Sequence, residues 1–202
     1  MKSTFANLTG RNGLLTGTVL AAALISAPLA AQSNSVFIDQ IGTGNTIELD
    51  QSAGTTQSAT VDQDGSGNLA NIEQRDSGDD SASVEQSGDD NEMAVLQEGD
   101  GDVELSLAQL GNGNSADIYQ NNPGGLGSLA EIVQNGNGNT ITLAQDGSDN
   151  QATLTQTGDA NAMTATQLSD GNRLEWTQNG TGLSDLNIVQ TGGAVAIISQ
   201  SN

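Results

Sequence analysis

The sequence of 202 residues contains no cysteine, no histidine and only 2 prolines. The chain therefore has no disulfide framework, no zinc site of the Cys/His type and no histidine for a catalytic triad. Aromatic residues make up 2% of the chain, so a core built on Phe, Tyr and Trp is not expected. Lys and Arg number 4 against 25 Asp and Glu, a formal net charge of −21. So acidic a chain has no electrostatic surface for nucleic acid or anionic lipid.

The N-terminal segment differs from the rest of the chain. Residues 1–31 contain two cations, Lys2 and Arg11, and no acid, and an apolar stretch runs from Leu14 to Ala31. A positive start, a short apolar run and small residues at its end are typical of a secretory signal peptide. The run is interrupted and short for a membrane anchor. We therefore predict a signal peptide over 1–31, an exported chain over 32–202, and no membrane insertion of that exported chain.

Glutamine recurs along the chain at steps of 10 to 12 residues, with a single step of 14. Two such units make a repeat of 22 or 23 residues. The long step contains the sequence Asn-Asn-Pro-Gly-Gly at 121–125, which indicates an enlarged turn inside the array. The fifteen glutamines are Gln40, Gln51, Gln63, Gln74, Gln86, Gln97, Gln109, Gln120, Gln134, Gln145, Gln156, Gln167, Gln178, Gln190 and Gln200.

Apolar residues alternate with polar ones before every glutamine. The positions two and four residues before it are apolar in all fifteen units, as in Val36 and Ile38 before Gln40, or Leu186 and Ile188 before Gln190. Because successive side chains of a strand point to opposite faces, this pattern predicts a strand with one buried face. Trp176 also lies on this inward parity. Glycine follows two residues after most glutamines and permits the positive φ of a tight turn.

A single unit cannot bury its apolar face, but pairs of units stacked on one another can. We therefore predict an all-β fold: a β-solenoid of about seven and a half two-stranded rungs with amyloid-like cross-β stacking. Side-chain amides both donate and accept, so columns of Gln and Asn on the inward parity are expected to form hydrogen-bonded ladders. The asparagines six residues before a glutamine are Asn34, Asn45, Asn68, Asn91, Asn114, Asn139, Asn150, Asn161 and Asn172.

This pattern resembles the curlin repeat, whose motif is Ser-x5-Gln-x4-Asn-x5-Gln. The same spacing occurs from Asn34 to Gln51, from Ser128 to Gln145 and from Asn161 to Gln178. Curlins build curli fibres on Gram-negative bacteria. The resemblance implies secretion across the outer membrane to the cell surface, templated polymerisation with itself, and a part in adhesion and biofilm matrix. It also implies a nucleating curlin subunit and outer-membrane export machinery as partners.

Two further features favour a polymer. Exposed strand edges recruit further strands, and we expect both ends of the stack to present such edges. The end units carry apolar residues on their outward parity, Phe37 in the first and Val195 and Ile197 in the last, so these are the predicted self-assembly ends. Acids are stacked between the ends: Asp39, Asp62 and Glu85 are expected on one sheet. Their repulsion is expected to delay assembly; the alternative is a merely solubilising surface.

No catalytic residue, metal site or cofactor is predicted, and the chain is not expected to be an enzyme. Residues 62–73 match an EF-hand calcium loop, yet Gln63, Gly65 and Asn68 follow the repeat's own pattern and no helix is predicted beside them. Loose calcium binding by the acidic turns remains an alternative. The second function considered is a monomeric secreted β-solenoid adhesin that binds calcium or carbohydrate.

Overall fold

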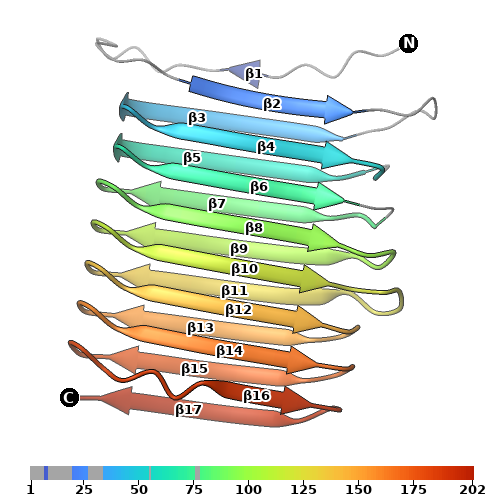
Figure 1. Cartoon of the computed structure of the whole chain (residues 1–202), viewed down its shortest axis with the longest axis vertical. Helices are drawn as coiled ribbons and strands as arrows, with labels where there is room; N and C mark the ends of the chain where they lie inside the picture. The colour runs from blue at the N-terminus through green and yellow to red at the C-terminus, as the bar shows by residue number, and fades with distance from the viewer. Residues whose placement is uncertain (1–6, 9–19, 27–33, 55, 76–77) are drawn as a thin grey trace.

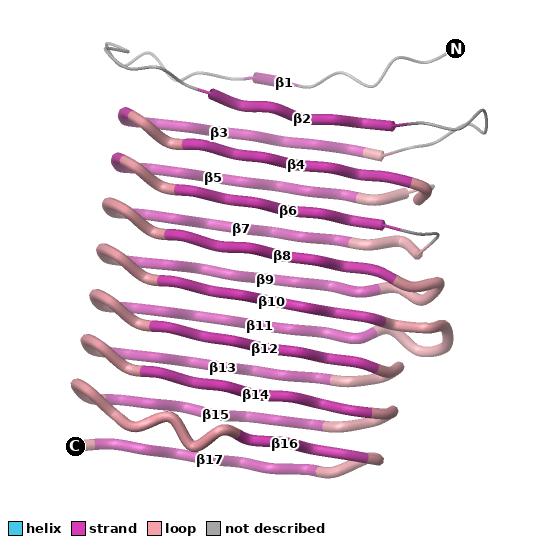
Figure 2. Tube along the Cα trace, viewed as in Figure 1, coloured by secondary structure: helices cyan, strands magenta, loops and turns pink. Residues whose placement is uncertain are grey.

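A computed structural model describes residues 7–8, 20–26, 34–54, 56–75 and 78–202. Every regular element in these ranges is a strand, and the strands form two sheets that face each other along the whole stack (Figures 1 and 2). The odd-numbered strands β1 to β17 form sheet A and the even-numbered strands β2 to β16 form sheet B. The described part of the chain contains no helix long and apolar enough to cross a membrane.

Fifteen strands follow the fifteen predicted units. Each is parallel to the strand two before it and, up to β15, to the strand two after it, and the pairing is in register, so that Gln63 lies opposite Gln86. These strands are β3 (Ser35–Thr43), β4 (Thr46–Ser52), β5 (Ser58–Ser66), β6 (Leu69–Arg75), β7 (Ser81–Ser87), β8 (Glu92–Glu98), β9 (Val103–Leu110), β10 (Ser115–Asn121), β11 (Ser128–Asn135), β12 (Thr140–Asp146), β13 (Gln151–Thr157), β14 (Ala162–Leu168), β15 (Arg173–Asn179), β16 (Ile188–Thr191) and β17 (Val195–Ser201).

The chain alternates between the sheets, so each strand advances the stack by half a rung. The strands of sheet A run opposite to those of sheet B, as the arrows in Figure 1 show. This arrangement is the predicted β-solenoid, and the fold class is confirmed.

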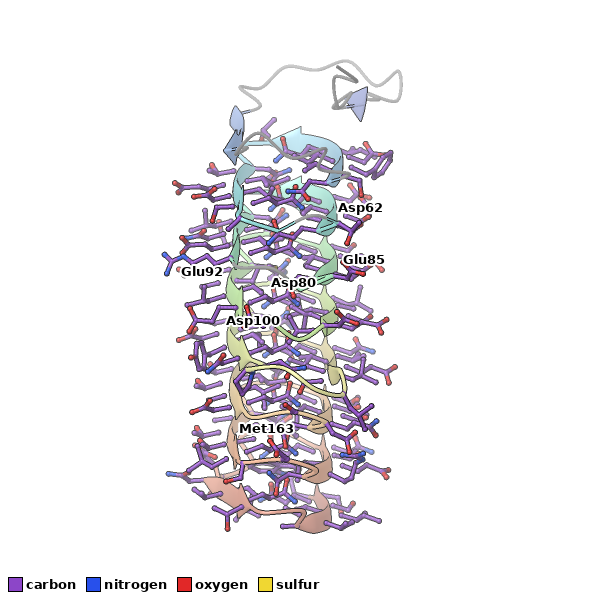
Figure 3. The ribbon with its side chains drawn as sticks, turned by 90° about the vertical axis from the view of Figure 1, so that its right-hand side faces the viewer. Asp62, Asp80, Glu85, Glu92, Asp100 and Met163 are labelled. Atoms are coloured by element: carbon purple, nitrogen blue, oxygen red, sulfur yellow. The ribbon has the colours of Figure 1, made fainter. Side chains whose placement is uncertain are left out.

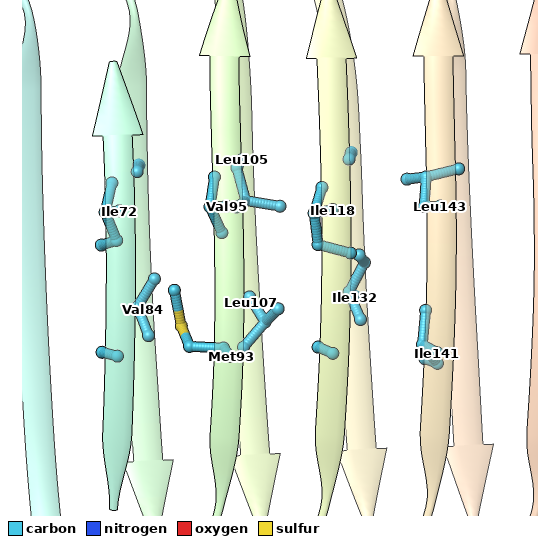
Figure 4. Close-up of a cluster of buried hydrophobic side chains, with 14 of the residues drawn as sticks. Ile72, Val84, Met93, Val95, Leu105, Leu107, Ile118, Ile132, Ile141 and Leu143 are labelled. Atoms are coloured by element: carbon cyan, nitrogen blue, oxygen red, sulfur yellow. The ribbon is translucent and has the colours of Figure 1, made fainter.

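A thin apolar core fills the space between the sheets (Figure 4). Strands β3 to β15 each direct at least two buried apolar side chains inward, and Ile72, Met93 and Ile118 are at most 1% exposed. The outward side chains between them are polar for the most part, which is the period-two alternation of a sheet with one dry face. Burial of this stripe requires rungs above and below, because each strand covers its neighbour's inward side chains.

The last turn of the solenoid departs from the predicted pattern. Leu186 was expected inward, but it is 47% exposed because β16 begins only at Ile188. Trp176 is fully buried in β15. Ala165 lies in β14, the strand before β15, and is the only alanine found two residues before any of the fifteen repeat glutamines. An indole fills far more of a narrow core than an aliphatic side chain does. A close-packed interior can hold it only where neighbouring side chains are smaller or lie outside the core. In the neighbouring strands Ala165 is the smallest residue at its position of the repeat, and Leu186 lies outside the core.

Part of the predicted signal peptide is placed against the first rung. Leu20–Ser26 forms β2, parallel to β4, and Asn7–Leu8 forms β1, parallel to β3. The predicted cleavage site near residue 31 lies outside the described residues. The division into a signal peptide over 1–31 and a repeat region over 32–202 therefore stays a prediction.

Candidate functional site

The glutamines of sheet A form one continuous column. Between successive rungs, the side-chain Nε2 of one glutamine donates to Oε1 of the glutamine one rung later, at 2.6–3.0 Å. The column comprises Gln40, Gln63, Gln86, Gln109, Gln134, Gln156, Gln178 and Gln200.

Sheet B carries the second column, with the same direction of donation and distances of 2.7–3.0 Å. Its members are Gln51, Gln74, Gln97, Gln120, Gln145, Gln167 and Gln190. Both columns have a direction, because the donor of every glutamine–glutamine hydrogen bond points toward the C-terminal end of the stack. We call them the glutamine ladders.

From Gln51 to Gln190, each ladder glutamine Nε2 also donates to a backbone carbonyl oxygen of the opposite sheet, which the sequence pattern does not predict. Gln109 Nε2 also donates to the carbonyl oxygen of Glu92 in the opposite sheet at 3.0 Å, and Gln97 Nε2 donates to that of Ser81 at 3.1 Å. The acceptor lies 16 or 17 residues earlier in these and most other units. Since a buried amide left without partners costs about 1–3 kcal/mol, the ladders stabilise the stack along its axis and also join the two sheets.

Asparagines form a second pair of columns at the starts of the strands. In one column the backbone N–H of each asparagine donates to Oδ1 of the asparagine one rung earlier, at 3.0–3.1 Å. Its members are Asn45, Asn68, Asn91, Asn114, Asn139 and Asn161. In the other column Asn34, Asn150 and Asn172 share the position with Gln57, Asp80, Val103 and Ser128, all buried.

The asparagine amides also hold the turns. Asn68 Nδ2 donates to the carbonyl oxygen of Gly88, and Asn91 Nδ2 to that of Gly111, both at 2.8 Å. Gly88 and Gly111 have φ of +118° and +114°, a conformation that L side chains rarely adopt. A Cβ on Gly88 would overlap the carbonyl oxygen of Gly111 in the next rung. This turn position therefore requires glycine for two reasons: the backbone has a positive φ, and the next rung leaves no room for a Cβ.

The enlarged turn contains a site residue that sequence reasoning missed. Asn122 is fully buried, and its Nδ2 donates to the carbonyl oxygens of Asp102 and Leu126 at 3.0 and 2.9 Å. Its Oδ1 accepts from Ser148 Oγ at 2.9 Å. The 14-residue step between glutamines was the signal that could have pointed to Asn122, because an insertion inside a tightly stacked array must supply hydrogen-bond partners for its own backbone groups.

Acids occupy two different positions on the surface (Figure 3). On the outer face of sheet A the registers place Asp39, Asp62 and Glu85 in neighbouring strands, as predicted. The turn acids instead accept backbone hydrogen bonds: Asp89 Oδ1 accepts from the N–H of Ser66 at 2.9 Å, and Asp159 Oδ1 from that of Asn137 at 2.8 Å. The turn acids thus contribute to the fold, while the acids on the sheet face stand beside like charges.

Two isolated groups have shifted pKa values. Burial and the hydrogen bond to Glu98 Oε1, at 2.7 Å, raise the pKa of Tyr119 to about 12. Burial opposes ionisation of Asp185, but the hydrogen bonds from Thr164 and from the N–H of Asn187 outweigh it and hold the pKa of that carboxyl below its ordinary value. Asp185 thereby ties the irregular segment before β16 to β14.

The residues of the EF-hand-like run do not form a loop. Residues 62–73 comprise the end of β5, a short turn and most of β6. Among the described residues no group of three or more acidic side chains is placed to hold a metal ion.

The two ends of the stack differ in which hydrogen-bonding groups of the glutamine ladders have no glutamine partner. At the first rung Gln40 Oε1 and Gln51 Oε1 are buried acceptors without a donor among the described residues. At the last rung Gln190 and Gln200 donate only to backbone carbonyl oxygens. The outward apolar residues predicted at the ends are exposed: Phe37 by 40%, Val195 by 71% and Ile197 by 76%.

A sequence model of the curlin-associated repeat matches the chain over residues 42–75 and 125–158. Each segment spans three ladder glutamines, from Gln51 to Gln74 and from Gln134 to Gln156. No curated protein and no solved structure shows significant similarity to the chain. The resemblance to the curlin repeat family is confirmed in these segments, and repeats of this kind in a solenoid indicate a structural protein rather than an enzyme.

Proposed function

Because the chain carries curlin-associated repeats, we propose that it is a secreted structural subunit that polymerises into extracellular curli-like amyloid fibres for adhesion and biofilm matrix. In this proposal residues 1–31 direct export and are removed, and residues 32–202 form the fibre. Its partners are further copies of itself, a nucleating curlin subunit and outer-membrane export machinery, at the surface of a Gram-negative bacterium.

The observation that carries the proposal is that successive rungs pair in the same parallel register and are joined by the same glutamine ladders. The parallel in-register pairing and the glutamine ladders continue from β3 to β17, although β16 pairs with β14 over four residues only. Among the described strands, β16 and β17 each have a neighbour on one side only. A strand edge with this register is a template for another chain of the same kind.

Removal of residues 1–31 would free the opposite end. β2 pairs with β4 along its whole length, and β1 pairs with β3 at Phe37 and Ile38; both β1 and β2 belong to the predicted signal peptide. Its cleavage during export would expose two strand edges and the acceptors of Gln40 and Gln51. Polymerisation would then begin only after export.

The test is assembly of protein purified after export from cells that express the full chain. We expect thioflavin-positive fibres whose diffraction shows reflections near 4.8 Å and about 10 Å. Ile197→Asp, at an exposed end position, should lengthen the lag of assembly several-fold. Leu126→Asp is the matched control, because Leu126 is 69% exposed but lies in a turn midway along the stack. A protein that stays monomeric for days would overturn the proposal and favour the adhesin.

A further inference from the structure

The number of strands is odd, and this determines how two copies can join. From β3 to β17 there are eight strands in sheet A and seven in sheet B, so one copy contains seven and a half rungs. The stack begins in sheet A with β3 and ends in sheet A with β17. The inference below rests on the proposed function, since it concerns the junction between copies in a fibre.

The polarity of the glutamine ladders makes the two ends complementary. The first rung offers two buried acceptors, Gln40 Oε1 and Gln51 Oε1. The last rung offers the amide donors of Gln190 and Gln200, which have no glutamine acceptor. Two first rungs would bring acceptor against acceptor. Only head-to-tail stacking of copies satisfies both ladders.

We propose that consecutive copies in the fibre are related by a half-turn about the fibre axis, so that sheet A of one copy continues into sheet B of the next. Because the chain alternates between the sheets, the strand position that follows β17 (sheet A) lies in sheet B, next to β16. The next copy begins with β3, so β3 takes that position and β4 lies against β17. Since the strands of the two sheets run in opposite directions (Figure 1), the half-turn keeps all pairs parallel.

The ladders fix the register of this junction. Gln190 of one copy donates to Gln40 of the next, and Gln200 donates to Gln51. Counting back one residue along each strand, Val189 then lies beside Asp39, and Ser199 lies beside Asp50. In this arrangement the seven-residue β17 takes the place on β4 that the seven-residue β2 holds in the unprocessed chain.

Stacking without the half-turn leaves one strand position empty. If β3 lay against β17, then β4 would lie two rungs from β16, about 9.6 Å away instead of 4.8 Å. Neither β16 nor β4 could then pair across the junction, and a row of backbone groups would stay unbonded in every copy. That stacking does bring Ile197 beside Phe37, but one side-chain contact does not replace the hydrogen bonds of a strand.

Disulfide formation in assembled fibres tests the junction, and the absence of native cysteine makes the readout clean. Neighbouring strands lie about 4.8 Å apart, within the range that a disulfide bridges. We expect the double variants Ser199→Cys with Asp50→Cys and Val189→Cys with Asp39→Cys to form covalent multimers on oxidation. The swapped pairs, Ser199→Cys with Asp39→Cys and Val189→Cys with Asp50→Cys, should remain monomeric on denaturing gels.

The control pair is Thr155→Cys with Thr177→Cys, which are register partners in β13 and β15 and should close within one chain. Multimers from the swapped pairs would overturn the half-turn while leaving the fibre intact. Absence of fibres in the wild-type protein would instead overturn the proposed function. Helical reconstruction gives a second readout: a rise of about 36 Å per copy, with a half-turn added to the twist that the rungs accumulate.

Discussion

Asn91 Nδ2 donates to the carbonyl oxygen of Gly111 at 2.8 Å, and this bond ties the start of β8 to the turn of the following rung. The same relation joins Asn68 to Gly88 and Asn139 to Gly158. The asparagine therefore serves the turn as well as its own column. The glycine at the turn is held in a conformation that leaves its carbonyl facing the amide.

Gly111→Ala is expected to lower the free energy of unfolding by about 2–4 kcal/mol, because φ of +114° is unfavourable for alanine and its Cβ would overlap the carbonyl oxygen of Gly136. Gly113→Ala is the control: φ is +64° and no atom lies near the added Cβ, so about 1 kcal/mol is expected. Urea unfolding of freshly exported protein measures both. Equal losses in the two variants would contradict the role of close stacking.

Gln109→Glu is expected to break the sheet A ladder at neutral pH. The carboxylate would face Gln134 Oε1, which now accepts from Gln109 Nε2 at 2.9 Å, and would leave the carbonyl of Glu92 without its donor. A loss of at least about 2–3 kcal/mol follows for a buried charge with unpaired neighbours. Burial raises the pKa of such a carboxyl, so the loss relative to wild type should shrink as the pH falls. Gln151→Glu, on an exposed side chain, should cost little.

Retention of residues 1–31 is expected to slow polymerisation. β2 covers the edge of β4, and β1 pairs with β3 at Phe37 and Ile38. Ile25 lies opposite Gln51 and has no amide to continue the sheet B ladder. A chain that keeps its leader should show a lag several times longer than residues 32–202 alone, and should add poorly to preformed fibre ends. The measurement is thioflavin kinetics with and without seeds; identical seeded rates would show that the leader does not block the end.

Neutralising the stacked acids on sheet A should accelerate assembly. Asp62 lies between Asp39 and Glu85 in register, and like charges about 5 Å apart oppose pairing. The double variant Asp62→Asn with Glu85→Gln is expected to shorten the lag and to reduce its dependence on salt. Glu131→Gln is the control, since its register partners Ser106 and Thr153 are uncharged. A similar acceleration by Glu131→Gln would assign the effect to net charge instead.

Tyr119 provides a spectroscopic test at high pH, because it is the only tyrosine in the chain. Its pKa is raised to about 12 by burial and by the hydrogen bond to Glu98. A raised folded-state pKa stabilises the fold fully below the unfolded value of about 10, and this contribution is lost as the pH rises from about 10 through 12. Tyrosinate absorbance should titrate near 12 in the folded protein and near 10 in urea. A folded midpoint near 10 would contradict the contact with Glu98.

Much of the fold follows from local pattern. The alternation of Val36 and Ile38 before Gln40 predicts the inward face of β3, and the same spacing predicts the strands of the remaining units. Leu186 shows where this reasoning fails: its position in the repeat is inward, yet Trp176 occupies the core and the strand starts late. A local pattern does not report the volume that a neighbouring rung already fills.

The sequence by itself determined the period, the buried face and the alignment of like amides, because a side-chain period of two and a fixed repeat length leave one register for each strand. Only the tertiary structure decided that the ladder glutamines from Gln51 to Gln190 bridge the two sheets, that the donors of both ladders point to the C-terminal end, and that turn acids accept hydrogen bonds from backbone N–H groups. These depend on which atoms meet across the core and between rungs. Residues 16 to 25 positions apart come into contact only once the stack is formed.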